Sequence, residues 1–443
     1  MSDFLQILIA AVAVGSTYAL LALGYTLVYG VLKFINFAHS DVFVLGAWTS
    51  FTASMFVTQR MNVDPAHAPW WVGLCVLLAA ISVASTVAYC IERFAYRPLR
   101  KSPRLNVLIT AIGVSLLLQN VGQLTGPAVV RETPTTVTKA AADLTPAERA
   151  SETTKINGEQ AQVQVQGKPL ATLPFGSSPR SMPVLLPDAV LNETTAATGV
   201  MDGGSRRGMV KLDKPVTLEE GRTYSLQTER LDASGKPTGE RETLGVASPA
   251  GTYEKGTDIR TQPARNAKDV QGAAYTLTIA PEVPIRLLDV LIVVSALVLM
   301  AGLEILVYRT KLGTAMRAIS YNVETAQLMG INVNLVISFT FVLGAALAAA
   351  AGFLYPMKYP GLNQPAHQIW VLLGLKAFVA AVVGGIGNIR GAVLGGFLIA
   401  LVEMFGAFYI STKLSDVFVF AILIFVLLVR PSGILGTTVR EKV

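Results

Sequence analysis

Two ionisable side chains lie within long apolar stretches, where a charge is well placed to do chemistry. Lys376 is about seven residues into the apolar segment 369–387, and Glu403 is near the middle of segment 391–411. Charged groups are costly in lipid and usually face the interior of a helix bundle. Lys376 therefore either faces a cavity on a transport pathway or extends to the outer surface. The two side chains form an ion pair if their segments are neighbours, and both are candidate pathway residues.

A second candidate set lies in the sequence NFAHSD at residues 36–41. Asn36, His39 and Asp41 are close together there, at the inner end of the first apolar segment, and histidine titrates near neutral pH. One interpretation is a cytoplasmic gate or a contact on a transport pathway. The other is a turn between two helices, in which Asn36 caps one helix and Ser40 or Asp41 begins the next. The sequence leaves both interpretations open.

The residue types needed for catalysis or metal binding do not cluster in this sequence. The histidines His39, His67 and His367 lie far apart, and Cys75 and Cys90 are about four helical turns apart in one apolar segment. No nucleophile triad and no pair of catalytic carboxylates is visible. We therefore expect a protein that is not an enzyme and that has no cofactor and no metal.

The glycine-rich sequence GGIGNIRGAVLGG at 384–396 invites comparison with a phosphate-binding loop. It lacks the Gly-Lys-Ser/Thr ending of such loops and a preceding soluble strand. We predict instead a tight cytoplasmic turn between two helices, in which small residues allow close packing. The glycines of this turn are Gly384, Gly385, Gly387 and Gly391.

The composition is that of a membrane protein. Of the 443 residues, 52% are hydrophobic and only 15% are charged, whereas soluble domains have about 25% charged residues. A membrane-spanning helix needs about 20 apolar residues. We predict an all-α polytopic membrane protein of eight or nine transmembrane helices, because the glycine-rich segment 369–387 either crosses the membrane or re-enters it. The candidate segments are 5–30, 40–56, 72–92, 105–125, 287–307, 335–356, 369–387, 391–411 and 416–430.

A polar insert at 127–285 interrupts these segments. It is rich in Thr, Gly, Pro, Glu and Lys and has no apolar span. Alternating polar and apolar residues at 161–167, 223–231 and 274–280 predict short strands. The part from 133 to 154 reads as a linker or surface helix, and disorder of the first half is the alternative. The predicted domains are a first transmembrane part (1–126), a β-rich or partly disordered extracytoplasmic insert (127–285) and a second transmembrane part (286–443).

Basic residues are distributed unequally between two sets of loops. One set holds thirteen, from Lys33 to Lys442, and the other holds four when the insert is left out. Loops rich in Lys and Arg lie in the cytoplasm, so we expect the N-terminus and the insert outside and the C-terminus inside. The insert holds 18 basic and 19 acidic residues. The net charge of +7 therefore belongs to the membrane part and indicates no nucleic-acid binding.

The predicted cytoplasmic loop 309–332 contains most of the sequence ETAQLMGINV, which begins at residue 324. Its residue types suit two short helices joined near Tyr321 and Asn322. Glu324 lies near the N-terminus of the second helix, where a carboxylate is favourable, and Gly330 ends that helix. The second helix is either an ordinary amphipathic loop helix or an element that docks on a partner.

This loop is one of five sequence blocks that resemble a known family. The others are STYALLALGYTLVYGVLKFINFAHSDVFVLGAW at 16–48, ERFAYRPLRKSPRLNVLITAIGVSLLLQN at 92–120, GLKAFVAAVVGGIGNIRGAVLGG at 374–396 and RPSGILG at 430–436. In this order they look like the branched-chain amino-acid ABC transporter permease, the LivH-type inner-membrane subunit. Two features depart from the family. Ser40 and Asp41 stand where the family usually has Gly-Glu, and the insert is far longer than the usual periplasmic loop.

The resemblance implies a permease subunit in the bacterial inner membrane that translocates leucine, isoleucine or valine. The implied partners are two cytoplasmic ATPase subunits, a second homologous permease and a periplasmic amino-acid-binding protein. In that family the loop is a coupling helix that docks on the ATPase, so the candidate coupling residues are Glu324, Thr325, Ala326 and Gly330. Two alternatives stay open, namely a urea or short-amide ABC permease and an ion-coupled secondary transporter.

Overall fold

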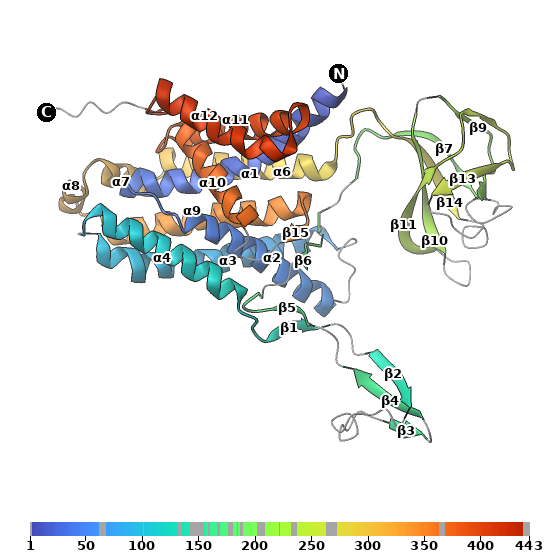
Figure 1. The fold of residues 1–443 in the computed structure, drawn as a ribbon, viewed down its shortest axis with the longest axis horizontal. Helices are drawn as coiled ribbons and strands as arrows, with labels where there is room; N and C mark the ends of the chain where they lie inside the picture. Colours follow the sequence, from blue (N-terminus) through green and yellow to red (C-terminus); the bar gives the residue numbers. More distant parts are fainter. Residues whose placement is uncertain are drawn as a thin grey trace. The chain divides into compact units, whose positions relative to one another are not determined.

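The computed structural model is mainly helical, with a smaller β-rich part (Figure 1). Among the described residues, eight helices are long and apolar enough to cross a membrane, and α10 (Gln368–Gly384) has a shorter apolar stretch. This confirms the predicted fold class of a polytopic helical protein with a small β-rich part. The structure describes residues 2–61, 68–100, 102–131, 135–140, 155–157, 160–165, 169–175, 180–183, 185–186, 189–201, 209–220, 222–231, 237–262, 273–362 and 368–436.

Each of the nine predicted apolar segments forms a helix. A chain in lipid must satisfy its backbone hydrogen bonds within itself, and a run of apolar residues does so as a helix. The helix ends lie within a few residues of the predicted ends. The remaining long helices are α1 (Ser2–Leu32), α2 (His39–Met61), α3 (Trp70–Cys90), α4 (Arg104–Gln123), α6 (Leu287–Arg309), α9 (Val333–Lys358), α11 (Ile389–Tyr409) and α12 (Ser415–Val429).

The chain divides into two compact units. The first unit comprises residues 7–188 and 288–443 and contains nearly all of the helical residues. The second comprises residues 189–287 with Met1–Gln6 and contains a six-stranded sheet.

Helices α1, α2 and α9 form the buried centre of the first unit, while few residues of α4 and α12 are buried. Glycines bring the backbones of the central helices together. A Cβ atom added at Gly46 of α2 would lie only 2.6 Å from the Cα of Ala349 in α9. A Cβ added at Gly396 of α11 would lie 2.7 Å from the Cα of Ala19 in α1. Close backbone contact of this kind provides the van der Waals packing that holds helices together in lipid.

Helix α2 begins well away from the end of α1. The chain leaves α1 through Lys33, which has a positive φ of 58°, and then runs back along the helix. His39, the first residue of α2, packs against Gly24 and Tyr25 of α1. Since Gly24 is eight residues before the end of α1, His39 lies about 12 Å from that end along the axis. The predicted placement of residues 36–41 at the inner end of the first helix is therefore wrong for His39.

Short strands accompany the helices in the first unit. Residues 135–140 form a strand, so the predicted linker or surface helix at 133–154 is wrong there, and residues 141–154 lie outside the described part of the chain. The strand predicted at 161–167 is confirmed at 161–165, and residues 166 and 167 lie outside the described part of the chain. The strands of this unit pair as β1 (Ala128–Arg131) with β5 (Pro169–Thr172), β2 (Thr135–Ala140) with β4 (Gln160–Val165), β4 with β3 (Lys155–Asn157), and β6 (Arg180–Ser181) with β15 (Gly361–Leu362).

The second unit is an antiparallel sheet with its own apolar core. Its strands follow the order β7-β14-β10-β11-β13-β8, and β9 pairs with β12. Met201, Leu226 and Leu277 are fully buried in this core. The strands predicted at 223–231 and 274–280 are confirmed. The bounds are β7 (Thr194–Val200), β8 (Met209–Lys211), β9 (Val216–Leu218), β10 (Tyr224–Leu231), β11 (Pro237–Val246), β12 (Gly251–Tyr253), β13 (Asp258–Gln262) and β14 (Ala274–Ile279).

Candidate functional site

The loop between α6 and α9 folds into a helical hairpin of α7 (Lys311–Tyr321) and α8 (Val323–Leu328). This confirms the two short helices joined near Tyr321 and Asn322. The Thr310 side chain accepts a hydrogen bond from the Gly313 backbone N–H at 3.1 Å and caps α7. The Asn322 side chain accepts one from the Thr325 N–H at 3.0 Å and caps α8. Because N-terminal caps satisfy otherwise unpaired backbone donors, each short helix has a defined start.

The four residues of the predicted coupling motif have different roles in this hairpin. Glu324 and Thr325 are exposed in the first turn of α8, while Ala326 is buried. Gly330 has a φ of +79°, a left-handed conformation that other residues adopt only at a cost. Its N–H donates to the Gln327 carbonyl at 2.9 Å. The motif therefore consists of an exposed acidic face, a buried contact and a helix end that favours glycine.

The tip of this hairpin exposes large apolar side chains. Tyr321 is 92% exposed, Leu328 87% and Met329 78%. On the other side of the hairpin, Met316 and Ile319 of α7 are buried in the helical core. A firmly seated hairpin with an apolar, acidic tip has the features of a docking surface, because exposed clusters of apolar residues commonly mark protein contacts.

Lys376 and Glu403 meet inside the helical unit, as the sequence predicts for neighbouring helices. The Lys376 ammonium lies 2.8 Å from Glu403 Oε1 and 2.6 Å from Asp416 Oδ1. Tyr18 donates from its hydroxyl to Glu403 Oε2 at 2.9 Å. The network thus joins α10, α11, α12 and α1. The sequence analysis did not identify Asp416 and Tyr18 as members of this network. Asp416 could have been identified, because it is an acidic residue in the first turn of an apolar helix.

Asn36 and His39 have structural contacts within the bundle. The Tyr96 hydroxyl donates to Asn36 Oδ1 at 2.7 Å, and both residues are buried. Tyr96 ends a π-helical turn at Ile91–Tyr96 that continues α3. The His39 ring lies edge-on to Tyr25, with 4.6 Å between the ring centroids. Its Nε2 is buried and has no hydrogen-bond partner among the described residues, while His67 and His367 lie outside them.

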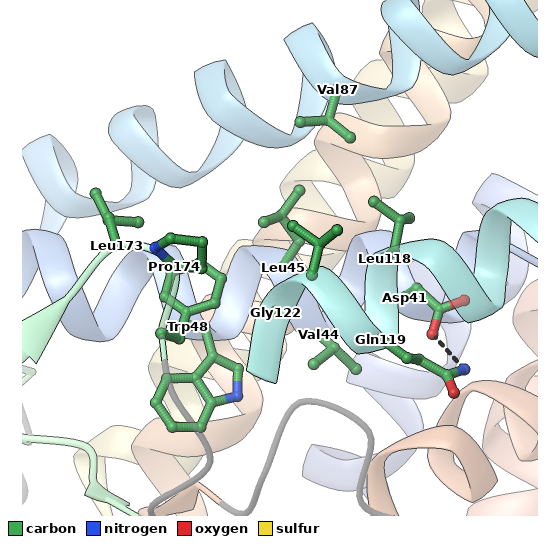
Figure 2. Close-up of a pocket in the computed structure, with 12 residues that line it drawn as sticks. Asp41, Val44, Leu45, Trp48, Val87, Leu118, Gln119, Gly122, Leu173 and Pro174 are labelled. Carbon is green, nitrogen blue, oxygen red and sulfur yellow. Dashed lines mark hydrogen bonds between the residues drawn. The ribbon is translucent and has the colours of Figure 1, made fainter. Parts of the chain in front are cut away.

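Asp41 points in another direction, towards α4. Its Oδ1 accepts a hydrogen bond from Gln119 Nε2 at 2.9 Å, and the same amide nitrogen donates to Ser115 Oγ at 3.1 Å. Figure 2 shows this pair at the side of a cavity of about 390 Å³. Gln119 was missed by sequence reasoning, because it is one of several uncharged polar residues in its apolar segment. Asp41 is therefore separate from the network of Lys376.

The glycine-rich turn between α10 and α11 brings two backbones into contact. A Cβ added at Gly384 would lie 1.9 Å from the Gly391 carbonyl oxygen, and one at Gly391 would lie 2.4 Å from the Gly384 oxygen. Gly385 and Gly387 have φ values of +112° and +93°. The Asn388 side chain accepts from the Gly391 N–H at 3.2 Å and caps α11. Glycine is thus needed here both for close approach and for the left-handed backbone.

Comparison with known proteins gives one family. The family model described as "Branched-chain amino acid transport system / permease component" matches residues 7–151 and 254–427. The high-affinity branched-chain amino acid transport system permease protein BraD of Pseudomonas aeruginosa is 31% identical over 99% of this chain and 98% of its own length. The corresponding permease protein LivH of Escherichia coli K12 has the same identity and coverage.

A more distant relative is the xylose transport system permease protein XylH of Escherichia coli K12, which is 31% identical over 37% of this chain and 39% of its own length. No solved structure matches the chain. The family model covers more than half of the chain, and the similarity to BraD and LivH extends over nearly all of it. The chain therefore belongs to the family of permease components of branched-chain amino acid transport systems, and it is a multi-pass inner-membrane protein.

Proposed function

We propose that this chain is the permease subunit of an ABC importer that translocates leucine, isoleucine or valine across the inner membrane. The observation that carries the proposal is the similarity, over nearly the full length, to two permeases of high-affinity branched-chain amino acid systems. Hydrolysis of ATP takes place on two cytoplasmic ATPase subunits. A second, homologous permease completes the pathway, and a periplasmic binding protein delivers the amino acid.

The α7–α8 hairpin is the proposed contact with the ATPase. Its buried side is seated on the helical core and its tip exposes Tyr321, Leu328 and Met329 beside Glu324. A small apolar helix with one acid fits a groove on a partner and transmits movement of that partner to α6 and α9. In this proposal Thr325 faces the groove, Ala326 anchors α8 to the hairpin, and Gly330 sets the direction of the chain into α9.

The proposed orientation follows from the basic residues. With the N-terminus outside, the thirteen basic residues of one loop set, which include Lys311 and Arg317 of the hairpin, lie in the cytoplasm. Nine crossings, with α10 as one of them, then leave the C-terminus in the cytoplasm. The glycine-rich turn between α10 and α11 is also cytoplasmic in this arrangement.

The insert 127–285 is placed by the same orientation in the periplasm, where the binding protein docks. We propose that it shapes or tethers that docking. Deleting residues 130–283 and measuring uptake and affinity for the binding protein tests this role. The docking role predicts a weaker affinity, and an unchanged affinity together with unchanged uptake would refute it.

The proposed function is tested by a pull-down of the purified permease with its candidate ATPases. Wild type is expected to retain an ATPase, while Glu324→Lys and Gly330→Pro lose it, because the first reverses the charge of the tip and the second cannot adopt a positive φ. Lys413→Glu is the matched control, since it reverses the charge of an exposed residue of the opposite loop set.

Two results would contradict this proposal. If wild type binds no ATPase, the ABC assignment fails, and uptake driven by an ion gradient becomes the test of the remaining alternative. If the ATPase binds and uptake of labelled leucine is absent, competition by urea and short amides decides between the substrates.

A further inference from the structure

A cavity of about 390 Å³ lies between α2, α3 and α4, beside the segment that follows β5 (Figure 2). Its walls are almost entirely apolar and include Val44, Leu45, Val87 and Leu118. Cavities that bind small molecules typically measure about 300–1,000 Å³, with apolar walls and a few placed polar groups. The cavity is thus large enough for a single amino acid, and the charged group in its wall is the carboxylate of Asp41.

Asp41 is only 4% exposed, yet one of its oxygens is unused. Gln119 donates to Oδ1, while Oδ2 is buried and has no hydrogen-bond partner among the described residues. A buried carboxylate with a free oxygen is unfavourable unless a cation or further donors complete it. The other buried acids of the described helices differ in this respect. Glu92 pairs with Arg100, and Asp289 pairs with Lys358.

An ammonium group has the chemistry to complete this carboxylate. Among the described residues no group of three or more His, Cys, Asp and Glu is placed to hold a metal ion. An ammonium needs only one carboxylate and a few hydrogen-bond acceptors, and it donates up to three hydrogen bonds. The walls beside Asp41 are aliphatic, so a molecule that enters must carry an ammonium at one end and an apolar body at the other.

We propose that Asp41 binds the α-ammonium group of the transported amino acid and that Val44, Leu45 and Leu118 contact its aliphatic side chain. This inference rests on the proposed function and names the substrate contact within it. Val44 and Leu45 lie one helical turn beyond Asp41 on α2, so the side chain extends along that helix. Gln119 is a positioning residue, because its amide holds Oδ1 and leaves Oδ2 directed to the ligand.

The cavity contains a second buried polar atom without a partner among the described residues. Trp48 lines the same cavity two turns beyond Asp41 on α2, and its Nε1 is buried without a hydrogen-bond partner among the described residues. The indole N–H is a donor only. Among the described residues, the cavity therefore offers an unused acceptor at Asp41 and an unused donor at Trp48.

The experiment uses the complete transporter reconstituted in lipid vesicles with its ATPases and leucine-loaded binding protein. Two quantities are measured for each variant, namely initial uptake of labelled leucine and ATP hydrolysis stimulated by the binding protein. Asp41→Asn keeps the shape and an acceptor for Gln119 but removes the charge. We expect uptake to fall by about tenfold or more, since a hydrogen bond to a charged group is lost, while stimulated hydrolysis stays within about twofold.

Asp41→Glu keeps the charge and is expected to retain clearly more uptake than Asp41→Asn. Glu304→Gln is the matched control, because it removes a carboxylate from an exposed ion pair with Arg390 on another membrane helix, and its uptake should equal wild type. Leu118→Trp fills the cavity and leaves Asp41 intact. Its uptake should also fall, and this variant decides the matter if Asp41→Asn fails to assemble.

The inference is overturned if wild type takes up leucine and Asp41→Asn takes it up at the same rate. If Asp41→Asn does not assemble, uptake by Leu118→Trp at the wild-type rate overturns it instead. If wild type takes up no leucine at all, the proposed function fails and the inference falls with it. Equal loss of uptake in Asp41→Asn and Asp41→Glu, with hydrolysis also lost, shows a structural acid and likewise overturns it.

Discussion

The ion network of Lys376 provides a quantitative test of how the four helices are held together. Lys376→Met removes the ammonium and leaves the carboxylates of Glu403 and Asp416 side by side, since both lie within hydrogen-bond distance of one nitrogen. Glu403→Gln is a milder change. It leaves Lys376 paired with Asp416, and the new amide oxygen still accepts from Tyr18.

The expected magnitudes follow from the burial of the three charges. Removing one partner of a buried ion pair costs about 3–5 kcal/mol, because the other charge is left uncompensated. Asp416 is 43% exposed and is solvated in part, so we place Lys376→Met near the lower limit, at about 3 kcal/mol. Glu403→Gln loses one charge-assisted hydrogen bond and should cost about 1–2 kcal/mol. In the double variant the surplus negative charge is reduced, so it should be more stable than Lys376→Met alone.

The assay is thermal unfolding of the purified protein in detergent, followed at one fixed heating rate. A loss of about 3 kcal/mol corresponds to a fall in Tm of roughly 3 °C for a chain of this length. Arg390→Met is the matched control. It removes a cation from an ion pair with Glu304 in which the Arg390 side chain is 75% exposed, and surface pairs contribute little. Its Tm should therefore match that of wild type.

Two outcomes would refute this reasoning. The first is a Tm for Lys376→Met equal to or above that of Glu403→Gln, which would show that the ammonium does not compensate both acids. The second is a double variant of Lys376→Met and Glu403→Gln that is less stable than either single variant. Additive losses of that kind would mean that the two side chains stabilise the bundle independently.

Two further predictions concern packing and a buried hydrogen bond. Gly46→Leu should destabilise the bundle by more than about 3 kcal/mol, because even a Cβ at this position would lie 2.6 Å from Ala349 Cα. The control Gly302→Leu should fold normally, because the space around Gly302 is open. Equal yields of folded protein for the two variants in gel filtration would contradict this prediction. Tyr96→Phe removes the hydroxyl that donates to the buried Asn36 Oδ1. The variant should lose about 1–3 kcal/mol of stability, which is measured as a lower Tm. An unchanged Tm would show that Asn36 finds another donor.

The helices of this protein were predictable because their signal is local. In lipid an apolar run of sufficient length must form a helix, and all nine segments do so. The joint of the α7–α8 hairpin near Asn322 and the end of α8 at Gly330 were also predictable, since both residues act on their nearest neighbours in sequence. The first part of the insert was misread at 135–140, where the short, polar strand β2 depends on pairing with β4.

The candidate site was predictable only in part. Lys376 and Glu403 stood out as charges in apolar segments, and the condition that their helices be neighbours is met. Asp416 and Tyr18 complete that network from α12 and α1, and nothing in the sequence pairs residues so far apart. The cavity beside Asp41 depends in the same way on Gln119, which is 78 residues away.

The sequence by itself determined which segments are helices, where polar and apolar residues alternate in the insert, and which loops carry the basic residues. These properties depend on neighbours within a few positions along the chain. Only the tertiary structure decided that α2 starts beside Gly24 rather than at the end of α1, and that Asp41 and the Lys376 network occupy separate places. Such contacts arise from close backbone packing at glycines and alanines. The residues next to a glycine or alanine in sequence do not indicate which distant helix it will contact.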